Sequence, residues 1–232
     1  MMRPSTIGSL APPLPGQRNG ERTLRLPVSP GKLAVVAPHP DDETLAAGGL
    51  IFDLIRAGWC VIVVVVTDGA ASHPDVRNLS GIREVECRRA VRQLGVSGRP
   101  TFLGFPDGEA PSNVGNIAAA LRESLADIDL VIAPRNDDGH SDHEATAQAL
   151  EMAFDSSGPP LLRYAIWGWE QLDAAQLNVD DAVTFRPTAE AMRAKQRALR
   201  QYQSQTTARY GRTIVGDAVL RRHTSATEVF WW

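Results

Sequence analysis

Apolar and polar positions along the chain form blocks that switch between the spacing of a buried strand and that of an amphipathic helix. Short apolar or β-branched runs predict strands at residues 32–37, 59–67, 100–105, 129–134, 161–169 and 227–232. Apolar residues at helical spacing predict helices between them, at residues 42–58, 81–95, 112–128, 141–154 and 187–205. The helix predicted at residues 141–154 is expected to begin with a capping box formed by Ser141 and Glu144.

The order of these elements predicts the fold class. Strands that alternate with helices are typical of an α/β protein in which helices cover both faces of a mostly parallel sheet. The connections are short, which favours a single doubly wound domain over residues 31–232. Residues 1–30 are rich in Pro, Gly and Ser without a period, so we expect an extended N-terminal arm that lies on the body or on a neighbouring subunit.

Composition narrows the class of protein further. The 232 residues are 43% hydrophobic, and the formal net charge is −3, so no basic excess indicates nucleic acid as a partner. The longest apolar run, residues 59–66, is too short to span a bilayer, and we expect no transmembrane segment. The first residues lack the apolar core of a secretory signal, and Cys60 and Cys87 form no disulfide framework. These features predict a cytoplasmic protein.

Polar residues follow four of the predicted strands, at residues 39–42, 67–69, 107–108 and 136–143. The carboxyl ends of parallel strands lie at one edge of a sheet, and ligands of doubly wound proteins bind there. The sequence therefore predicts an active site at this edge.

Three residues at this edge have the chemistry of a metal site. His39 and Asp42 have the spacing H-x-x-D at a strand-to-helix turn, and His143 lies in the first turn of a later helix. Two imidazole nitrogens and one carboxylate oxygen leave coordination positions open for water and substrate, as catalytic zinc requires. The same donor set also suits non-haem iron.

The neighbouring residues are candidates for the chemistry. Asp41 could accept a proton from metal-bound water, and His140 could stabilise an oxyanion or protonate a leaving group. Asp142 could orient a histidine by accepting its other N–H.

Simpler interpretations exist for several of these residues. An Asp at the start of a helix is most often an N-cap. Asn136, Asp137 and Asp138 are expected to be a solvated loop. His73 is expected to be a loop residue, and His223 has no partner motif that would assign it a role.

The motifs PHPDDE at 38–43 and HSDH at 140–143 resemble those of the PIG-L (LmbE-like) family of zinc-dependent de-N-acetylases. Further segments are similar to that family: TDG at 67–69, REVE at 83–86, PDG at 106–108 and KQRALRQYQSQ at 195–205. The resemblance covers residues 32–206 and leaves the N-terminal arm outside it.

The resemblance implies a Rossmann-like fold and removal of acetyl groups from N-acetylglucosamine-type substrates. It implies that His39, Asp42 and His143 are the zinc ligands and that Asp41 is the general base. It also implies that His140 stabilises the transition state or acts as the acid, with Asp142 behind it. Arg83 matches a position that contacts the substrate, and Asp107 matches one that can hold sugar hydroxyls.

We therefore expect a Zn²⁺-dependent amide hydrolase, with Fe²⁺ as the alternative metal, acting on a small N-acetylated amino sugar or its conjugate. The alternatives are another metal-dependent amidase, a non-haem Fe(II) oxygenase or a non-catalytic sugar-binding module. The parallel α/β pattern weighs against the oxygenase, in which Asp41 would have no role. The general base and the metal ligands are all present, which weighs against a non-catalytic sugar-binding module. The protein could also form a homo-oligomer.

Overall fold

The computed structural model describes residues 22–24, 29–154, 158–173 and 175–232. Its main sheet has five strands in the order β4-β3-β2-β5-β6. They are β4 (Thr101–Phe105), β3 (Cys60–Thr67), β2 (Lys32–Ala37), β5 (Leu130–Pro134) and β6 (Leu161–Tyr164). Every neighbouring pair is parallel. The predicted α/β class with a mostly parallel sheet is confirmed.

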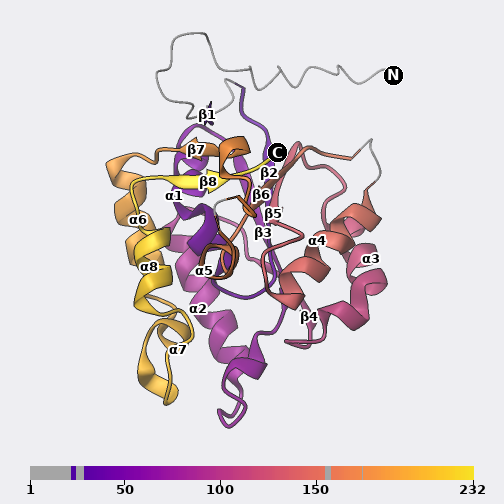
Figure 1. The fold of residues 1–232 in the computed structure, drawn as a ribbon, viewed down its shortest axis with the longest axis vertical. Coiled ribbons are helices and arrows are strands. Elements are labelled where there is room, and N and C mark those ends of the chain that lie inside the picture. The colour runs from indigo at the N-terminus through magenta and orange to yellow at the C-terminus, as the bar shows by residue number, and fades with distance from the viewer. Residues whose placement is uncertain (1–21, 25–28, 155–157, 174) are drawn as a thin grey trace.

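Helices cover both faces of this sheet (Figure 1). One face carries α1 (Asp42–Arg56), α2 (Leu79–Gln93) and α6 (Ala189–Leu199), and the other carries α3 (Val114–Ser124) and α4 (Ser141–Ala153). Leu33 and Val35 of β2 pack into the first core cluster, whereas Ala34 and Val36 pack into the second. Burial on both faces explains why the strand sequences are continuous apolar runs rather than alternating ones.

A second sheet of three short strands lies beside the first. It has the order β1-β7-β8 and consists of β1 (Arg22–Thr23), β7 (Val183–Phe185) and β8 (Glu228–Phe230). The sequence predicts β8, which lies within the apolar run at residues 227–232, but it does not predict β1 or β7. Most of the predicted arm over residues 1–30 lies outside the described residues, so its extended form stays a prediction.

The remaining elements are short. They are α5 (Gly168–Gln171), α7 (Gln203–Thr206), α8 (Asp217–His223) and the 3₁₀ turns at Ala70–Ser72, Ala110–Asn113, Val179–Asp181 and Ala208–Tyr210.

Two of the predicted elements end at least five residues earlier than expected. The strand predicted at 161–169 ends at Tyr164, because the backbone amides of Ile166 and Gly168 donate to the Asp138 carboxylate instead of continuing a ladder. The helix predicted at 187–205 is interrupted after Leu199, and the side chain of Tyr202 is buried in the gap between α6 and α7.

The strand order brings together the two loops that carry the candidate metal ligands and their neighbours. Strands β2 and β5 are neighbours, although β3 and β4 separate them in the chain. The strand order reverses between β2 and β5, and in doubly wound sheets ligands bind at such a switch point. The loop from β2 to α1 carries residues 39–41, and the loop from β5 to α4 carries residues 135–140.

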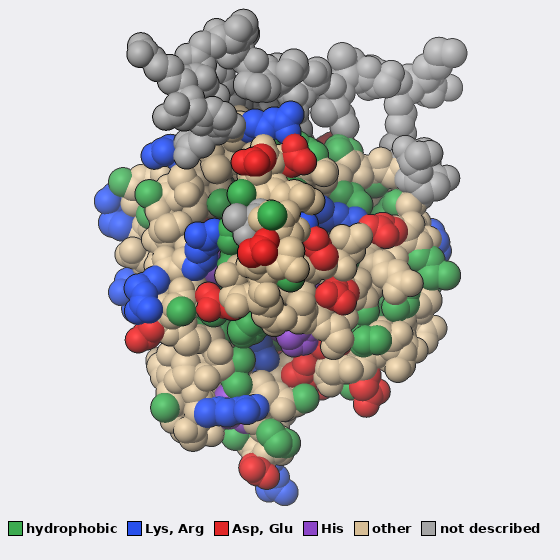
Figure 2. Space-filling model, in the orientation of Figure 1, with side chains coloured by type: hydrophobic (Ala, Val, Ile, Leu, Met, Phe, Trp, Pro, Cys, Tyr) green, Lys and Arg blue, Asp and Glu red, His purple; other side chains and the backbone are tan. Residues whose placement is uncertain are grey.

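The described surface is mixed in charge. Figure 2 shows acidic and basic side chains interspersed over one face. Among the described residues, no helix combines the length and the apolar character needed to cross a membrane. Cys60 and Cys87 are both free thiols.

Candidate metal centre

The fold brings His39, Asp42 and His143 to one point. Asp42 Oδ2 lies 3.3 Å from His39 Nδ1 and 3.2 Å from His143 Nε2. One donor atom from each residue lies within 4.8 Å of the others, and all three side chains are buried. The three residues that the sequence selects as ligands therefore form one cluster.

The second nitrogen of each imidazole faces a carboxylate. His39 Nε2 lies 3.1 Å from Asp142 Oδ2, and His143 Nδ1 lies 2.6 Å from Asp138 Oδ2. An acceptor on one ring nitrogen fixes the proton there and leaves the other nitrogen free to bind a metal. In this arrangement His39 Nδ1 and His143 Nε2 are the nitrogens directed at Asp42.

The cluster fits a divalent metal ion. His143 Nε2 is buried and faces Asp42 Oδ2 at 3.2 Å, and His39 Nδ1 lies 3.3 Å from the same oxygen. A cation between the three residues could take both nitrogens and the carboxylate oxygen as ligands. Two nitrogen donors and one carboxylate are a donor set that zinc and iron both accept.

The electrostatics of the cluster also favour a cation. Burial lowers the pKa of His143, but Asp42 and Asp138 raise it to about 9. Burial likewise opposes ionisation of Asp42, yet His143 and His39 hold the pKa of that carboxyl well below its usual value. The carboxylates around the two imidazoles therefore stabilise positive charge at this point, whether it is carried by protons or by a metal.

Asp41 precedes α1 in an unusual backbone conformation, with φ 154° and ψ −27°. Such a conformation costs about 1–3 kcal/mol for a residue with a side chain and is found mostly at functional sites. Asp41 Oδ2 lies 3.2 Å from Arg83 Nη2. Burial raises the pKa of Asp41 to about 7, although the Arg83 guanidinium lowers it, and the charge of Asp42 raises it further.

His140 lies next to the triad and begins α4. Its ring centroid is 4.9 Å from that of His39 and 5.0 Å from that of His143. Its Nδ1 accepts the backbone N–H of Asp142 at 3.2 Å, so His140 is the N-cap. The predicted capping box with Ser141 as N-cap is therefore wrong. Burial and the nearby charges of His39 and His143 lower the pKa of His140.

The Asp142 carboxylate contacts His39 and two backbone N–H groups. Besides His39 Nε2, its oxygens accept the backbone N–H groups of Gly108 at 2.8 Å and Ala110 at 3.1 Å. The prediction that Asp142 orients a histidine matches this geometry for His39, and a ring nitrogen of His140 also lies within 4.8 Å of an Asp142 carboxylate oxygen.

Arg83 and Asp107, the predicted substrate contacts, lie close to the cluster. Arg83 is only 3% exposed, and its guanidinium donates to the carbonyls of Gly69 at 2.8 Å and Pro40 at 3.0 Å as well as pairing with Asp41. Its partners are thus protein groups. Asp107 Oδ1 lies 3.1 Å from His39 Nε2, and its side chain retains 11% exposure.

Sequence reasoning missed Asp138. The residue is fully buried, whereas Asn136 is exposed and Asp137 is half-buried and paired with Arg135, so the solvated-loop expectation is wrong for Asp138 alone. Two adjacent aspartates in a polar run give no sign of which one turns inward. Only the contacts of its carboxylate with the segment after β6 distinguish it.

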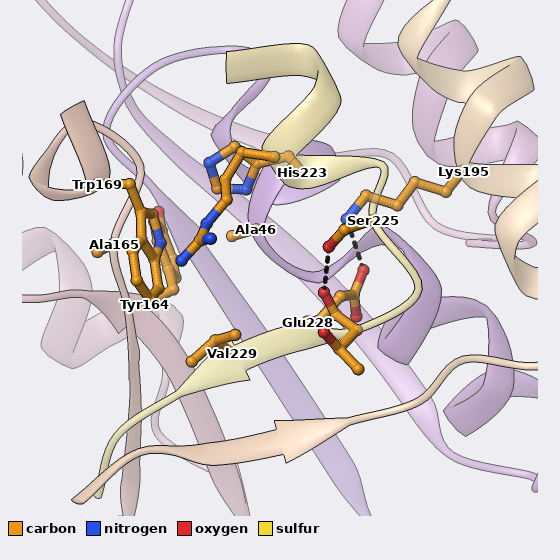
Figure 3. A pocket seen from close by; sticks show the side chains of 11 residues that line it. Ala46, Tyr164, Ala165, Trp169, Lys195, His223, Ser225, Glu228 and Val229 are labelled. Carbon is orange, nitrogen blue, oxygen red and sulfur yellow. Dashed lines mark hydrogen bonds and ion pairs between the residues drawn. The ribbon is translucent and has the colours of Figure 1, made fainter. Parts of the chain in front are cut away.

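The two other histidines lie outside the cluster. His73 occupies a loop, where its Nε2 lies 2.9 Å from the carbonyl oxygen of Arg212. His223 lines a separate pocket of about 70 Å³ (Figure 3).

The same pocket contains a buried ion pair against α1. Lys195 Nζ lies 2.7 Å from Glu228 Oε1 and donates to the carbonyl of Leu45 at 2.8 Å. Glu228 also accepts the backbone N–H groups of Gly49 at 2.7 Å and Leu50 at 2.8 Å. This pair joins α6 and β8 to the middle of α1.

A comparison of the sequence with known protein families finds a match over the segment that contains the three proposed ligands. The family described as PIG-L: GlcNAc-PI de-N-acetylase matches residues 34–154, a span that contains the whole triad and covers about half of the chain. The chain belongs to the PIG-L family.

Curated PIG-L relatives are similar over part of their length. A 2′-N-acetylparomamine deacetylase of Streptomyces fradiae is 29% identical over 166 residues, which cover 62% of this chain and 60% of the relative. A 1D-myo-inositol 2-acetamido-2-deoxy-alpha-D-glucopyranoside deacetylase of Mycobacterium sp. (strain KMS) is 30% identical over 157 residues, covering 53% and 50%. The chain thus spans about half the length of these relatives.

A solved structure supports the fold. The crystal structure of the A40926 pseudoaglycone deacetylase Dbv21 superposes with a TM-score of 0.71 at 23% identity, and the match covers 87% of this chain and 96% of the other.

Proposed function

We propose that this PIG-L protein is a zinc-dependent amide hydrolase that removes the acetyl group from an N-acetylglucosamine-type amino sugar or its conjugate. The observation that carries this proposal is the buried triad of His39, Asp42 and His143, next to the buried Asp41, whose carboxyl interacts electrostatically with Asp42 and His39. The deacetylase names of the curated relatives support the class of substrate.

The metal would be held by His39 Nδ1, His143 Nε2 and Asp42 Oδ2, the three atoms that face one another. When bound, zinc supplies a Lewis acid that polarises an acetyl carbonyl and makes water acidic near neutral pH. Asp142 and Asp138 keep the protons of the two imidazoles on the far nitrogens, so the near ones stay available as ligands.

The chain's own groups would move the protons. Asp41 takes the proton from the attacking water as a C–O bond to the acetyl carbon forms. His140 donates to the carbonyl oxygen or to the leaving nitrogen, and the C–N bond breaks to release acetate and a protonated amine. Asp107, which remains partly exposed, is assigned to the sugar hydroxyls, and Arg83 acts through Asp41.

Three broader assignments accompany this proposal. Residues 31–232 form one deacetylase domain, the substrate is a small molecule rather than nucleic acid, and the free thiols of Cys60 and Cys87 support a reducing, cytoplasmic location.

The test combines metal analysis with acetate release from N-acetylglucosamine, N,N′-diacetylchitobiose and an N-acetylglucosaminyl inositol. The wild type should carry about one zinc per chain, lose acetate release on chelation and regain it with zinc. Asp41→Asn should keep its metal while turnover falls by ~10²–10⁴-fold, the usual contribution of a general base. Asp42→Ala should lose metal and activity together. Full activity in metal-free protein, or metal loss in Asp41→Asn alone, would contradict the proposal.

A further inference from the structure

Asp41 precedes the proposed ligand Asp42 and holds its carboxyl against Arg83 from a backbone conformation that few residues adopt. Its carbonyl is held by the helix, since it accepts the N–H groups of Thr44 at 3.1 Å and Leu45 at 2.9 Å. Its amide is held by a side chain: the N–H of Asp41 donates to Glu43 Oε2 at 3.2 Å. The Glu43 side chain therefore fixes the amide of Asp41, while backbone amides of α1 fix its carbonyl.

Glu43 is itself fixed on its other oxygen. The side chain is fully buried, and Oε1 accepts the hydroxyls of Thr44 and Tyr202. One carboxylate oxygen thus serves the Asp41 amide and the other serves two hydroxyl donors. With both oxygens occupied, the carboxylate cannot rotate away from Asp41 without losing a hydrogen bond.

Tyr202 reaches this point from 159 residues further along the chain. It is fully buried and lies beyond the span that matches the family, 34–154. Two residues later, Ser204 donates its N–H to Glu86 Oε1 at 3.0 Å and its hydroxyl to Glu86 Oε2 at 2.6 Å. Glu86 lies on α2, the helix that also carries Arg83, so this segment contacts both elements that hold Asp41.

We propose that Glu43 and Tyr202 are positioning residues for Asp41. The Tyr202 hydroxyl orients the Glu43 carboxylate, and that carboxylate holds the Asp41 amide so that the Asp41 carboxyl keeps its position next to Arg83. The proposal rests on the proposed role of Asp41 as the base. Both side chains are fully buried, so they act through Asp41 rather than by touching the substrate.

The first experiment replaces Tyr202 by Phe, which removes one hydroxyl and keeps the ring. We expect kcat for acetate release to fall by ~10-fold, with KM within about twofold and metal content unchanged, because a small displacement of a reacting group can cost up to ~10²-fold. The control is Tyr164→Phe. Tyr164 is equally buried and its hydroxyl donates to the carbonyl of Val36 at 3.0 Å, so its loss should leave kcat within about twofold.

Substitutions of Glu43 test the acceptor itself. Glu43→Gln keeps an amide oxygen for the Asp41 N–H, and its NH₂ group can donate to the two hydroxyls, so most of the activity should remain. Glu43→Leu removes the acceptor, and kcat should fall by ~10²-fold. Equal losses in the Gln and Leu variants would overturn the role of the acceptor.

A double-mutant cycle separates positioning from general damage. In an Asp41→Asn background, Tyr202→Phe should cause no further loss of kcat, because its effect passes through Asp41. A purely structural defect would lower turnover in both backgrounds by the same factor, and that result would overturn the proposal.

Hydrogen exchange gives a readout that needs no activity. The Asp41 amide should exchange at least ~10-fold faster in Tyr202→Phe, while the Leu45 amide, which donates to the Asp41 carbonyl, should be unchanged. If the wild type releases no acetate but this difference is seen, the proposed function fails and the positioning network stands. If the wild type is active and Tyr202→Phe changes neither kcat nor exchange, the positioning proposal alone fails.

Discussion

Replacing Asp138 by Asn should weaken metal binding while the chain stays folded. The substitution exchanges one carboxylate oxygen for an NH₂ group. Asp138 Oδ1 accepts the backbone N–H groups of Ile166 at 2.8 Å and Gly168 at 2.9 Å. These two donors will hold the amide oxygen of Asn at the same place, so its NH₂ group will face His143 Nδ1, which lies 2.6 Å from Oδ2 in the native chain.

The consequence is a change of tautomer at His143. Two N–H donors cannot face each other, so the imidazole must accept at Nδ1 and carry its proton on Nε2, the nitrogen that faces Asp42. In that form Nε2 cannot bind a metal. Turning the Asn amide around would instead leave two backbone N–H groups facing a donor, at about 1–3 kcal/mol each.

The expected size of the effect is that of losing the partner that orients a ligand. Such losses lower metal affinity by about 10–100-fold. Since each factor of ten corresponds to about 1.4 kcal/mol, the free energy of metal binding becomes less favourable by roughly 1.4–2.8 kcal/mol. Because the two backbone hydrogen bonds survive, the metal-free variant should still fold, with a lower melting temperature than the metal-free wild type because His143 loses the carboxylate that raises its pKa.

The assay is titration of metal-free protein with zinc against a competing chelator, together with thermal unfolding. Asp137→Asn is the matched control, because it makes the same chemical change one residue away, on a side chain that is 44% exposed and paired with Arg135. Its zinc affinity should equal that of the wild type. A folded Asp138→Asn variant with native zinc affinity, or an equal loss in Asp137→Asn, would refute the reasoning.

Two further predictions concern the ligands and the packing of α1. Elemental analysis should show that His143→Ala loses bound zinc. His73→Ala should keep its zinc, because the His73 imidazole contacts a backbone carbonyl in a loop. The opposite pattern would contradict the assignment of His143 as a ligand. Gly49→Ala should destabilise the chain by about 1–3 kcal/mol, because a Cβ there would lie 2.7 Å from Pro187 Cβ. Thermal unfolding should show a fall of about 2–4 °C for each kcal/mol. Gly115→Ala, with nothing within 4 Å of its added Cβ, should not lower the melting temperature, and equal falls in the two variants would contradict the packing argument.

Local spacing was enough to predict the sheet and the triad. The apolar runs of β2, β3 and β5 differ in period from the helices between them, and that difference predicts a parallel α/β sheet. A parallel sheet places the turn after β2 and the turn after β5 at one edge, so His39, Asp42 and His143 could be grouped before any contact was known.

The partners that orient these residues could not be predicted in the same way. Asp138 differs from Asp137 only in the direction of its side chain, and that direction depends on where the chain turns after β6. Arg83 looks like an ordinary charge on a helix until α2 packs its guanidinium against Asp41. Tyr202 reads as one position of a long helix, because periodicity does not show that a buried hydroxyl finds a carboxylate 159 residues away.

The ion pair between Lys195 and Glu228 also has a consequence for how the protein is made. The Glu228 carboxylate binds amides of α1 that precede it by 179 and 178 residues, and Lys195 reaches the Leu45 carbonyl across 150 residues. At a synthesis rate of about 5–20 residues per second, α1 is made roughly 10–35 s before Glu228 exists. During translation, the helix that begins with Asp42 therefore lacks its contacts with Lys195 and Glu228 until nearly all of the described chain has been made.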